Sequence, residues 1–227
     1  MQGVTHMQIR RLFHSRTWPS LLLITLLITP RPAFTQAPPA VTLPKPRMEG
    51  GKPLMQALKE RQSARQFSSE KLPIQILSDL LWAAWGVNRA DGRRTAPSAV
   101  NAQEIDVYVA LADGTYLFEP RSHTLKPVLA GDNRSKAGTQ PFVAQAPLNL
   151  IYVADYAKMG AAKPEDKPVW AAAGSGFIGQ NVYLFCASEG LVTVFRAYVD
   201  REVVSKALGL RPDQKVLFSQ TVGYPQK

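Results

Sequence analysis

The stretch Glu60-Arg61-Gln62-Ser63-Ala64-Arg65-Gln66-Phe67 contains two arginines four residues apart, with a serine between them. Two guanidinium groups and a hydroxyl group at this spacing can converge on one phosphate, because arginine binds phosphate through paired, charge-assisted hydrogen bonds. The alternative is that both arginines lie on the solvated end of a helix. The candidate binding residues in this stretch are Arg61, Gln62, Ser63 and Arg65.

A second stretch, residues 94–103, combines a proline, small side chains and an amide ahead of a predicted strand. Small side chains let a flat ring lie close to backbone N–H groups, and the Asn101 amide can both donate to and accept from a ring edge. The alternative is a plain loop without a ligand. The candidate binding residues here are Pro97, Ser98, Ala99 and Asn101.

The hydrophobic pattern around these stretches predicts one α/β or α+β domain in which helices and strands are interleaved. Apolar residues at helical spacing predict a helix beginning near Pro53 and a second from Pro73 to Trp85, and a run of small and apolar residues predicts a long helix over 168–189. Early glycines in the long helix suggest close approach to another helix or a ligand, because glycine costs about 1 kcal/mol per helical position. Further elements are a helix at 200–208 and strands at 105–109, 116–118, 148–153 and 215–222.

The first 36 residues have the layout of a secretory signal peptide, with basic residues before a short apolar run and small residues after it. The run is shorter than the roughly 20 apolar residues that a membrane span needs, and no later stretch predicts stable membrane insertion. A buried N-terminal helix is the alternative. Arg10-Arg11 resembles a twin-arginine signal, and an ordinary basic region is the other interpretation. The expected organisation is a signal peptide (1–36), a Pro-rich tether (37–50) and a folded domain (51–227) of a periplasmic or secreted protein.

Composition narrows the possible chemistry. The chain has 227 residues, 27 lysines and arginines against 17 acidic residues, and a single cysteine. One cysteine excludes an intramolecular disulfide and a cysteine-based zinc site, so no metal site is expected. Loss of the signal peptide would remove four arginines and lower the net charge from +10 to +6. The remaining charge is spread along the chain without interleaved aromatics, which disfavours a nucleic-acid partner.

Few side chains are available for acid–base or nucleophilic catalysis. His123 is the one histidine beyond the predicted signal peptide, and its segment predicts an exposed turn. A serine–histidine or cysteine–histidine pair is therefore not expected. Cys186 lies on the apolar face of the predicted long helix, which favours core packing. No residue is assigned as catalytic, and a bound cofactor is expected to carry the reaction.

Together, the two stretches resemble in order and spacing the motifs of the nitroreductase-like FMN-dependent family. Gly179-Gln180-Asn181 in the long helix and Val222-Gly223-Tyr224-Pro225 in the last strand are similar as well. Residues 81–87 and 92–99 look most like the branch that contains thiazoline and oxazoline dehydrogenases. The resemblance covers about residues 48–225, and the ordered set of motifs is more specific than any single one.

The resemblance implies an α+β fold, in which helices flank a central, mainly antiparallel sheet and a long helix lies at the interface of a homodimer. It implies FMN as cofactor. Arg61, Ser63 and Arg65 would hold the phosphate and the ribityl chain, with Gln62 beside them. The flavin ring would be lined by four residues of the other subunit, those at positions Pro97, Ser98, Ala99 and Asn101.

Two departures from the family pattern bear on function. Arg196 stands where a glycine is expected, and it could place a cation near the ring or the substrate. Glu104 and Ile105 replace the Tyr-Pro pair typical of the branch, so the peptide substrate of that branch does not simply carry over. The resulting hypothesis is an exported oxidoreductase that transfers hydride through flavin N5 to or from a small or peptide-like substrate. The alternative is a catalytically silent exported protein that binds flavin or another ligand.

Overall fold

The computed structural model describes residues 1, 3 and 38–226. The predicted signal peptide therefore lies almost entirely outside the described residues. Within them, seven strands form one sheet in which each strand pairs with its neighbours in antiparallel orientation, in the order β1-β4-β3-β2-β5-β7-β6. The strands are β1 (Val41–Thr42), β2 (Ile105–Ala110), β3 (Gly114–Glu119), β4 (Thr124–Ala130), β5 (Leu148–Asp155), β6 (Val192–Arg196) and β7 (Gln214–Gly223). This arrangement confirms the predicted α+β fold.

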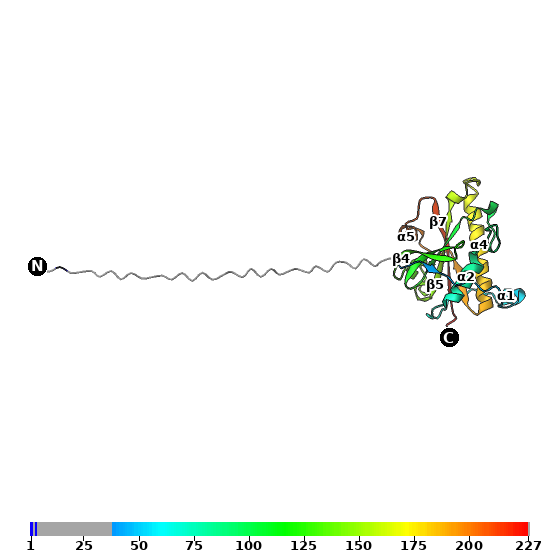
Figure 1. Ribbon diagram of the computed structural model, residues 1–227, viewed down its shortest axis with the longest axis horizontal. Helices are drawn as coiled ribbons and strands as arrows, with labels where there is room; N and C mark the ends of the chain where they lie inside the picture. The colour runs from blue at the N-terminus through cyan, green and yellow to red at the C-terminus, as the bar shows by residue number, and fades with distance from the viewer. Residues whose placement is uncertain (2, 4–37, 227) are drawn as a thin grey trace. The chain divides into compact units, whose positions relative to one another are not determined.

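Helices cover both faces of the sheet (Figure 1). The helices α1 (Leu54–Glu60), α2 (Ile74–Trp85) and α4 (Lys167–Glu189) lie on one side, and α5 (Arg201–Leu208) lies on the other. The short helix α3 (Phe142–Gln145) and three single-turn 3₁₀ helices complete the described elements; the latter are η1 (Ala99–Asn101), η2 (Arg134–Ala137) and η3 (Tyr156–Lys158). No helix among the described residues is both long and apolar enough to cross a bilayer.

The alternation of side chains along the central strands builds two cores. On one face of the sheet, Val107 and Leu150 pack with apolar residues of α2 and α4, which include Leu80 and Ile178. On the other face, neighbouring strand residues such as Ile151 pack with side chains of η2, α3 and α5. The sheet is therefore buried on both sides, and the 3.6-residue periodicity that predicted α2 reflects the first of these two cores.

Glycines let α4 lie close to the sheet. A Cβ atom at Gly174 would be 2.7 Å from Oε1 of Glu104, and one at Gly179 would be 2.5 Å from Cδ2 of Phe195. A Cβ at Gly176, by contrast, would meet no heavy atom within 4 Å. The structure shows close approach at two positions, but to β6 and to the residue before β2, whereas the prediction named another helix or a ligand.

Three strands were not predicted, and each lacks a clear sequence signal. β4 contains Pro127, which cannot donate a ladder hydrogen bond and so argues against a strand. β1 has two residues, and it pairs with β4 through Val41 and Leu125. Residues 41–47 are consequently attached to the domain, since Leu43 is buried and its N–H donates to the His123 carbonyl at 3.2 Å. The third strand, β6, lies at the opposite edge of the sheet and positions the site described next.

Candidate functional site

The first motif begins where α1 ends and continues along the free edge of β6. The N–H of Arg61 donates to the Ala57 carbonyl at 2.9 Å and closes the last turn of α1. The chain then turns extended, and Ser63 forms an isolated parallel bridge with Thr193, while the Ala64 N–H donates to the Thr193 carbonyl at 3.0 Å. Backbone pairing with β6 therefore fixes the position of Ser63 relative to the sheet.

Tyr183 of α4 connects the side chains of this motif. Its hydroxyl lies 2.7 Å from Oγ of Ser63 and accepts a hydrogen bond of 2.9 Å from the Phe195 N–H. The guanidinium of Arg61 lies over the Tyr183 ring, 5.3 Å from its centroid. Sequence reasoning missed Tyr183. The only available signal was a lone tyrosine among the small and apolar residues of the long helix.

A cavity of about 490 Å³ lies beside this group and has a basic lining. Arg61 and Gln62 line it, together with Lys52, Lys59 and Glu60. Lys52 is neutralised by Glu60 through an ion pair of 2.5 Å, so two cations remain without a carboxylate in the lining. Arg65 is exposed and does not line this cavity. The structure thus brings Arg61, Gln62 and Ser63 together, with Arg65 just beyond them along the extended segment.

The second motif is a strained loop that Gln103 holds in place. Val100, Asn101 and Gln103 all have positive φ angles, of 49°, 55° and 50°. Such angles are rare for residues other than glycine, most of all for a β-branched one. The Gln103 N–H donates to Oγ of Ser98 at 3.0 Å, and its side-chain amide donates to the Gly92 carbonyl at 3.1 Å and to Oδ1 of Asn101 at 3.0 Å. Gln103 is a second residue that sequence reasoning missed.

This loop borders a separate cavity of about 500 Å³. Three of its four predicted binding residues, Pro97, Ser98 and Asn101, line the cavity, and Ala99 adjoins them in the chain. The other lining residues are Ala96, Val100 and the arginines 89, 93 and 94. Among the described residues, no residue lines both this cavity and the one beside Arg61. The two motifs therefore form two separate groups within one chain.

The structure does not bring Arg196 to either group. Val194 and Arg196 share the face of β6 opposite to Phe195, and the Arg196 side chain is enclosed there, with 4% of the residue exposed. Its guanidinium donates to Oγ1 of Thr221 at 2.8 Å and, at longer range, to Oδ1 of Asn149 and the Ala137 carbonyl. Burial lowers the pKa of Arg196 to about 10. The expectation that Arg196 places a cation near a bound ring thus gains no support from this geometry.

Three other titratable side chains are not among the predicted binding residues, although Glu104 directly follows Gln103 and Cys186 lines the cavity beside the first motif. Glu104 is fully buried, neither carboxylate oxygen has a hydrogen-bond partner, and burial raises its pKa. Nε2 of His123 lies 2.7 Å from Oγ of Ser78, and burial lowers the pKa of this histidine. Burial likewise raises the pKa of Cys186, so the thiol stays protonated. In the described part of the chain, no three acidic, histidine or cysteine residues gather as a metal site would require.

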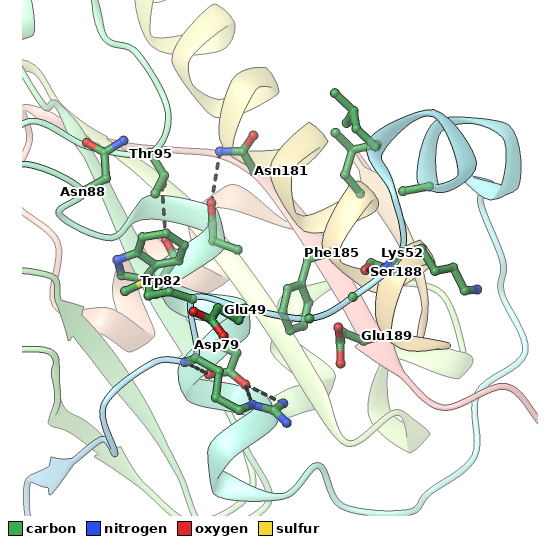
Figure 2. Close-up of a pocket in the computed structure, with 18 residues that line it drawn as sticks. Glu49, Lys52, Asp79, Trp82, Asn88, Thr95, Asn181, Phe185, Ser188 and Glu189 are labelled. Carbon is green, nitrogen blue, oxygen red and sulfur yellow. Dashed lines mark hydrogen bonds and ion pairs between the residues drawn. The ribbon is translucent and has the colours of Figure 1, made fainter.

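A third cavity, of about 510 Å³, separates residues 47–52 from α2 and α4 (Figure 2). An ion pair between Arg47 and Asp79 lies at one end of it, and the rings of Trp82 and Phe185 line its middle. The Asn181 amide on α4 donates to the Ala83 carbonyl at 3.1 Å and joins the two helices. This cavity lies on the helical side of the sheet and shares a single lining residue, Lys52, with the cavity beside the first motif.

Comparison with known proteins identifies the chain. A model of the nitroreductase family matches residues 58–224, which include both motifs. The chain belongs to the nitroreductase family. Membership indicates an oxidoreductase, and it confirms the family resemblance that the two motifs carry.

Relatives agree with the assignment. A protein of Methanocaldococcus jannaschii named as a nitroreductase is 32% identical over 161 residues, which cover 66% of this chain and 81% of that protein. A crystal structure from Ralstonia eutropha, described as a nitroreductase, is 42% identical with a TM-score of 0.81 and covers 88% of this chain and 96% of that one. A chain of the E. coli microcin synthetase complex is 20% identical with a TM-score of 0.64, covering 93% of this chain and 85% of that one, which is a likeness of fold alone. The antiparallel sheet and long α4 of this nitroreductase-family chain match such neighbours.

Proposed function

We propose that this chain is an FMN-dependent oxidoreductase that transfers two electrons, as hydride, to or from a small or peptide-like substrate. The observation that carries the proposal is the group formed by Arg61, Ser63 and Tyr183 beside a basic cavity, in a chain of the nitroreductase family. A phosphate monoester needs cations and hydroxyl donors at one place, and this group offers both. The donor set therefore fits the phosphate end of FMN.

Each part of the chain would have a distinct task in that reaction. Arg61, Ser63 and Arg65 would bind the phosphate and the ribityl chain, with Gln62 beside them, and the loop with Pro97, Ser98, Ala99 and Asn101 would line the ring. When bound, FMN supplies a hydride donor and acceptor at N5. The chain's own residues would position the cofactor and the substrate. No acid–base role is assigned to His123, which contacts Ser78, or to the buried Cys186.

A homodimer would unite the two motifs in one site. In a single chain they border separate cavities, and a flavin that contacts both requires a second copy. Apolar side chains on the helical side are exposed in the described chain, with exposed fractions of 62% for Leu54 and 49% for Phe177. Val100 in the second motif is also 69% exposed. Such a set of exposed apolar residues favours an interface between copies of the chain.

Export and a dehydrogenase-like reaction complete the proposal. The basic, apolar and small-residue layout of residues 1–36 supports a signal peptide and hence a periplasmic or secreted enzyme. The resemblance of residues 92–99 supports the thiazoline and oxazoline dehydrogenase-like branch. Nicotinamide reductants are scarce outside the cytoplasm, so oxidation of the substrate is the favoured direction of reaction.

The second candidate function is a flavin-binding or ligand-binding protein without turnover. It is favoured by Glu104, because a buried carboxyl without a partner stands where the branch has a Tyr-Pro pair. This carboxyl is fully buried next to Gly174 of α4 and does not line any of the three cavities described above. Steady-state assays with a panel of electron donors and acceptors separate the two functions, since only the enzyme turns over.

Purification with flavin analysis tests the proposal. We expect a yellow protein with about one FMN per chain, and a colourless protein that FMN cannot reconstitute would refute it. Arg61→Gln and Ser63→Ala should each weaken FMN binding about tenfold, the effect of losing one charge-assisted hydrogen bond. Arg201→Gln on α5 is the matched control, because its guanidinium bonds only the Leu217 carbonyl among the described residues. Flavin fluorescence titration measures all three dissociation constants.

A further inference from the structure

Three arginines gather at the second motif. Arg89, Arg93 and Arg94 line the cavity of about 500 Å³ together with Pro97, Ser98 and Asn101, and we call this cavity the arginine pocket. A fourth arginine, Arg121, lies behind it, close enough that a Cβ atom at Gly92 would be 2.9 Å from its Nη1. The first motif and its proposed role do not account for this second cluster of cations.

Little negative charge balances the cluster. No aspartate or glutamate lines the arginine pocket in the described chain. Arg93 pairs with Asp91 at 3.4 Å, but both side chains are more than half exposed, and exposed pairs of this kind contribute little. Arg89 donates to Oδ1 of Asn88 at 2.9 Å and to the Arg94 carbonyl at 3.3 Å, which are neutral acceptors. The pocket therefore keeps an uncompensated positive potential.

The Arg94 guanidinium is fixed in place by protein contacts, and part of it is buried. Its Nε donates to Oε1 of Gln103 at 2.9 Å, and its guanidinium lies over the Trp85 ring, 5.5 Å from the centroid. Nη1 is buried and has no hydrogen-bond partner in the described chain. Burial and the charge of Arg121 lower the pKa of Arg94 to about 10, and the charges of Glu119 and Asp106 only partly offset this effect. A buried donor without an acceptor calls for an explanation.

We propose that the arginine pocket binds a carboxylate or phosphate group of the redox substrate. This inference rests on the proposed function, because the loop from Pro97 to Asn101 would line the flavin ring and so set the substrate beside it. Arginine suits such groups, since its planar fork of donors matches two oxygens at once. Arg89 and Arg93 are exposed and would bind the anion directly. Arg94 is partly buried and would add positive electrostatic potential to the pocket. The enzyme would therefore prefer anionic over neutral substrates of equal shape.

Binding of benzoate and benzamide to the purified, FMN-loaded protein tests this inference without turnover. The two ligands have the same ring and nearly the same size, and only benzoate is charged. Titration calorimetry and the change in flavin absorbance should both show tighter binding of benzoate, by about tenfold for one charge-assisted contact. The double variant Arg89→Gln/Arg93→Gln should lose this preference, and the control Arg201→Gln should keep it. Urea unfolding checks that each variant is folded.

Further measurements distinguish phosphate binding from carboxylate binding, and failure of this inference from failure of the proposed function. Phenyl phosphate in place of benzoate shows whether the pocket favours phosphate over carboxylate. The inference is overturned if the parent shows no preference for benzoate, or if the double variant retains it. It is also overturned if the double variant weakens FMN binding as much as Arg61→Gln does, because the pocket would then hold the cofactor phosphate. If the protein binds no FMN, the proposed function fails, and calorimetry on the flavin-free protein still decides whether benzoate requires Arg89 and Arg93.

Discussion

Replacing Arg196 with methionine tests whether this buried cation serves the fold or the cofactor. Its guanidinium is enclosed beneath β6, where it donates to Thr221 at 2.8 Å and to Asn149 and Ala137 at 3.3 and 3.4 Å. No carboxylate pairs with it among the described residues. Methionine has a similar length, is uncharged and is adaptable in irregular apolar space. The substitution therefore removes the charge without opening a large cavity.

The expected change in stability is the difference of two terms of similar size. Burial lowers the pKa of Arg196 to about 10, and at 1.36 kcal/mol for each pKa unit below the usual value of arginine this corresponds to a cost of about 3 kcal/mol for the charged form. The short hydrogen bond to Thr221 contributes about 1.5–3 kcal/mol as a bond from a charged donor, and the two long ones contribute less. The terms nearly cancel, so the free energy of unfolding of Arg196→Met should lie within about 1.5 kcal/mol of the parent. Arg196→Ala should lose about 2–5 kcal/mol, because it leaves a cavity.

Urea unfolding and FMN titration of the same proteins provide the assay. FMN affinity should change less than twofold in Arg196→Met but fall about tenfold in Arg61→Met, the matched change in the first motif. Equal losses of FMN affinity in the two variants would place Arg196 in the cofactor site. A loss of more than about 3 kcal/mol in Arg196→Met would show that the buried guanidinium is strongly stabilising, and would refute the balance worked out above.

Three further predictions concern neighbouring features. Gly138→Ala should destabilise the parent, because its Cβ would overlap Nη1 of Arg196, and should cost less in the Arg196→Met background; a double-mutant cycle in urea that gives zero coupling would contradict this. Burial raises the pKa of Glu104 above 4.5, so the native state binds the proton more tightly than the unfolded state, and stability falls as pH rises through and above 4.5. Glu104→Gln should remove this fall. Urea unfolding at several pH values from 4 to 8 measures it, and an equal dependence of the unfolding free energy on pH in both proteins would count against the prediction. Tyr183→Phe should lose about 1–3 kcal/mol in urea, because the Phe195 N–H is left without its acceptor; unchanged stability would show that water replaces the hydroxyl.

The sequence predicted the elements that carry strong periodicity. α2 buries one face in the core, so its apolar residues recur at helical spacing. Composition served for the other elements, because α4 is a long run of small and apolar residues, and β2 and β5 are rich in β-branched and apolar residues. The short β6 has a weaker signal, because its five residues follow directly on the helix end at Gly190. An alternating pattern also does not tell which face of an edge strand is covered. For this reason the sequence could not place Arg196 on the face away from α4.

The candidate site was predictable where residues act through local spacing. Arg61 and Ser63 are two positions apart, and the extended backbone there follows from the end of α1. Tyr183 lies 120 residues further along the chain, and its contact with Ser63 depends on how α4 crosses the sheet. Gln103 was missed for a different reason, since a polar residue before a strand has no distinctive pattern. Tyr183 matters through a long-range contact, whereas the Gln103 contacts join residues 2 to 11 positions apart and depend on the conformation of the loop.

The strained loop of the second motif is held by contacts that need no ligand. Non-glycine residues with positive φ cost of order 1–3 kcal/mol each and persist only where the surroundings fix them. Val100 is largely exposed, so burial does not offset its strain. The hydrogen bonds of Gln103 to Ser98, Gly92, Asn101 and Arg94 do so instead. Because the same residue orders the loop and fixes Arg94, the shape of the loop and the charge of the arginine pocket are set together before any ligand binds, which lowers the ordering cost of binding.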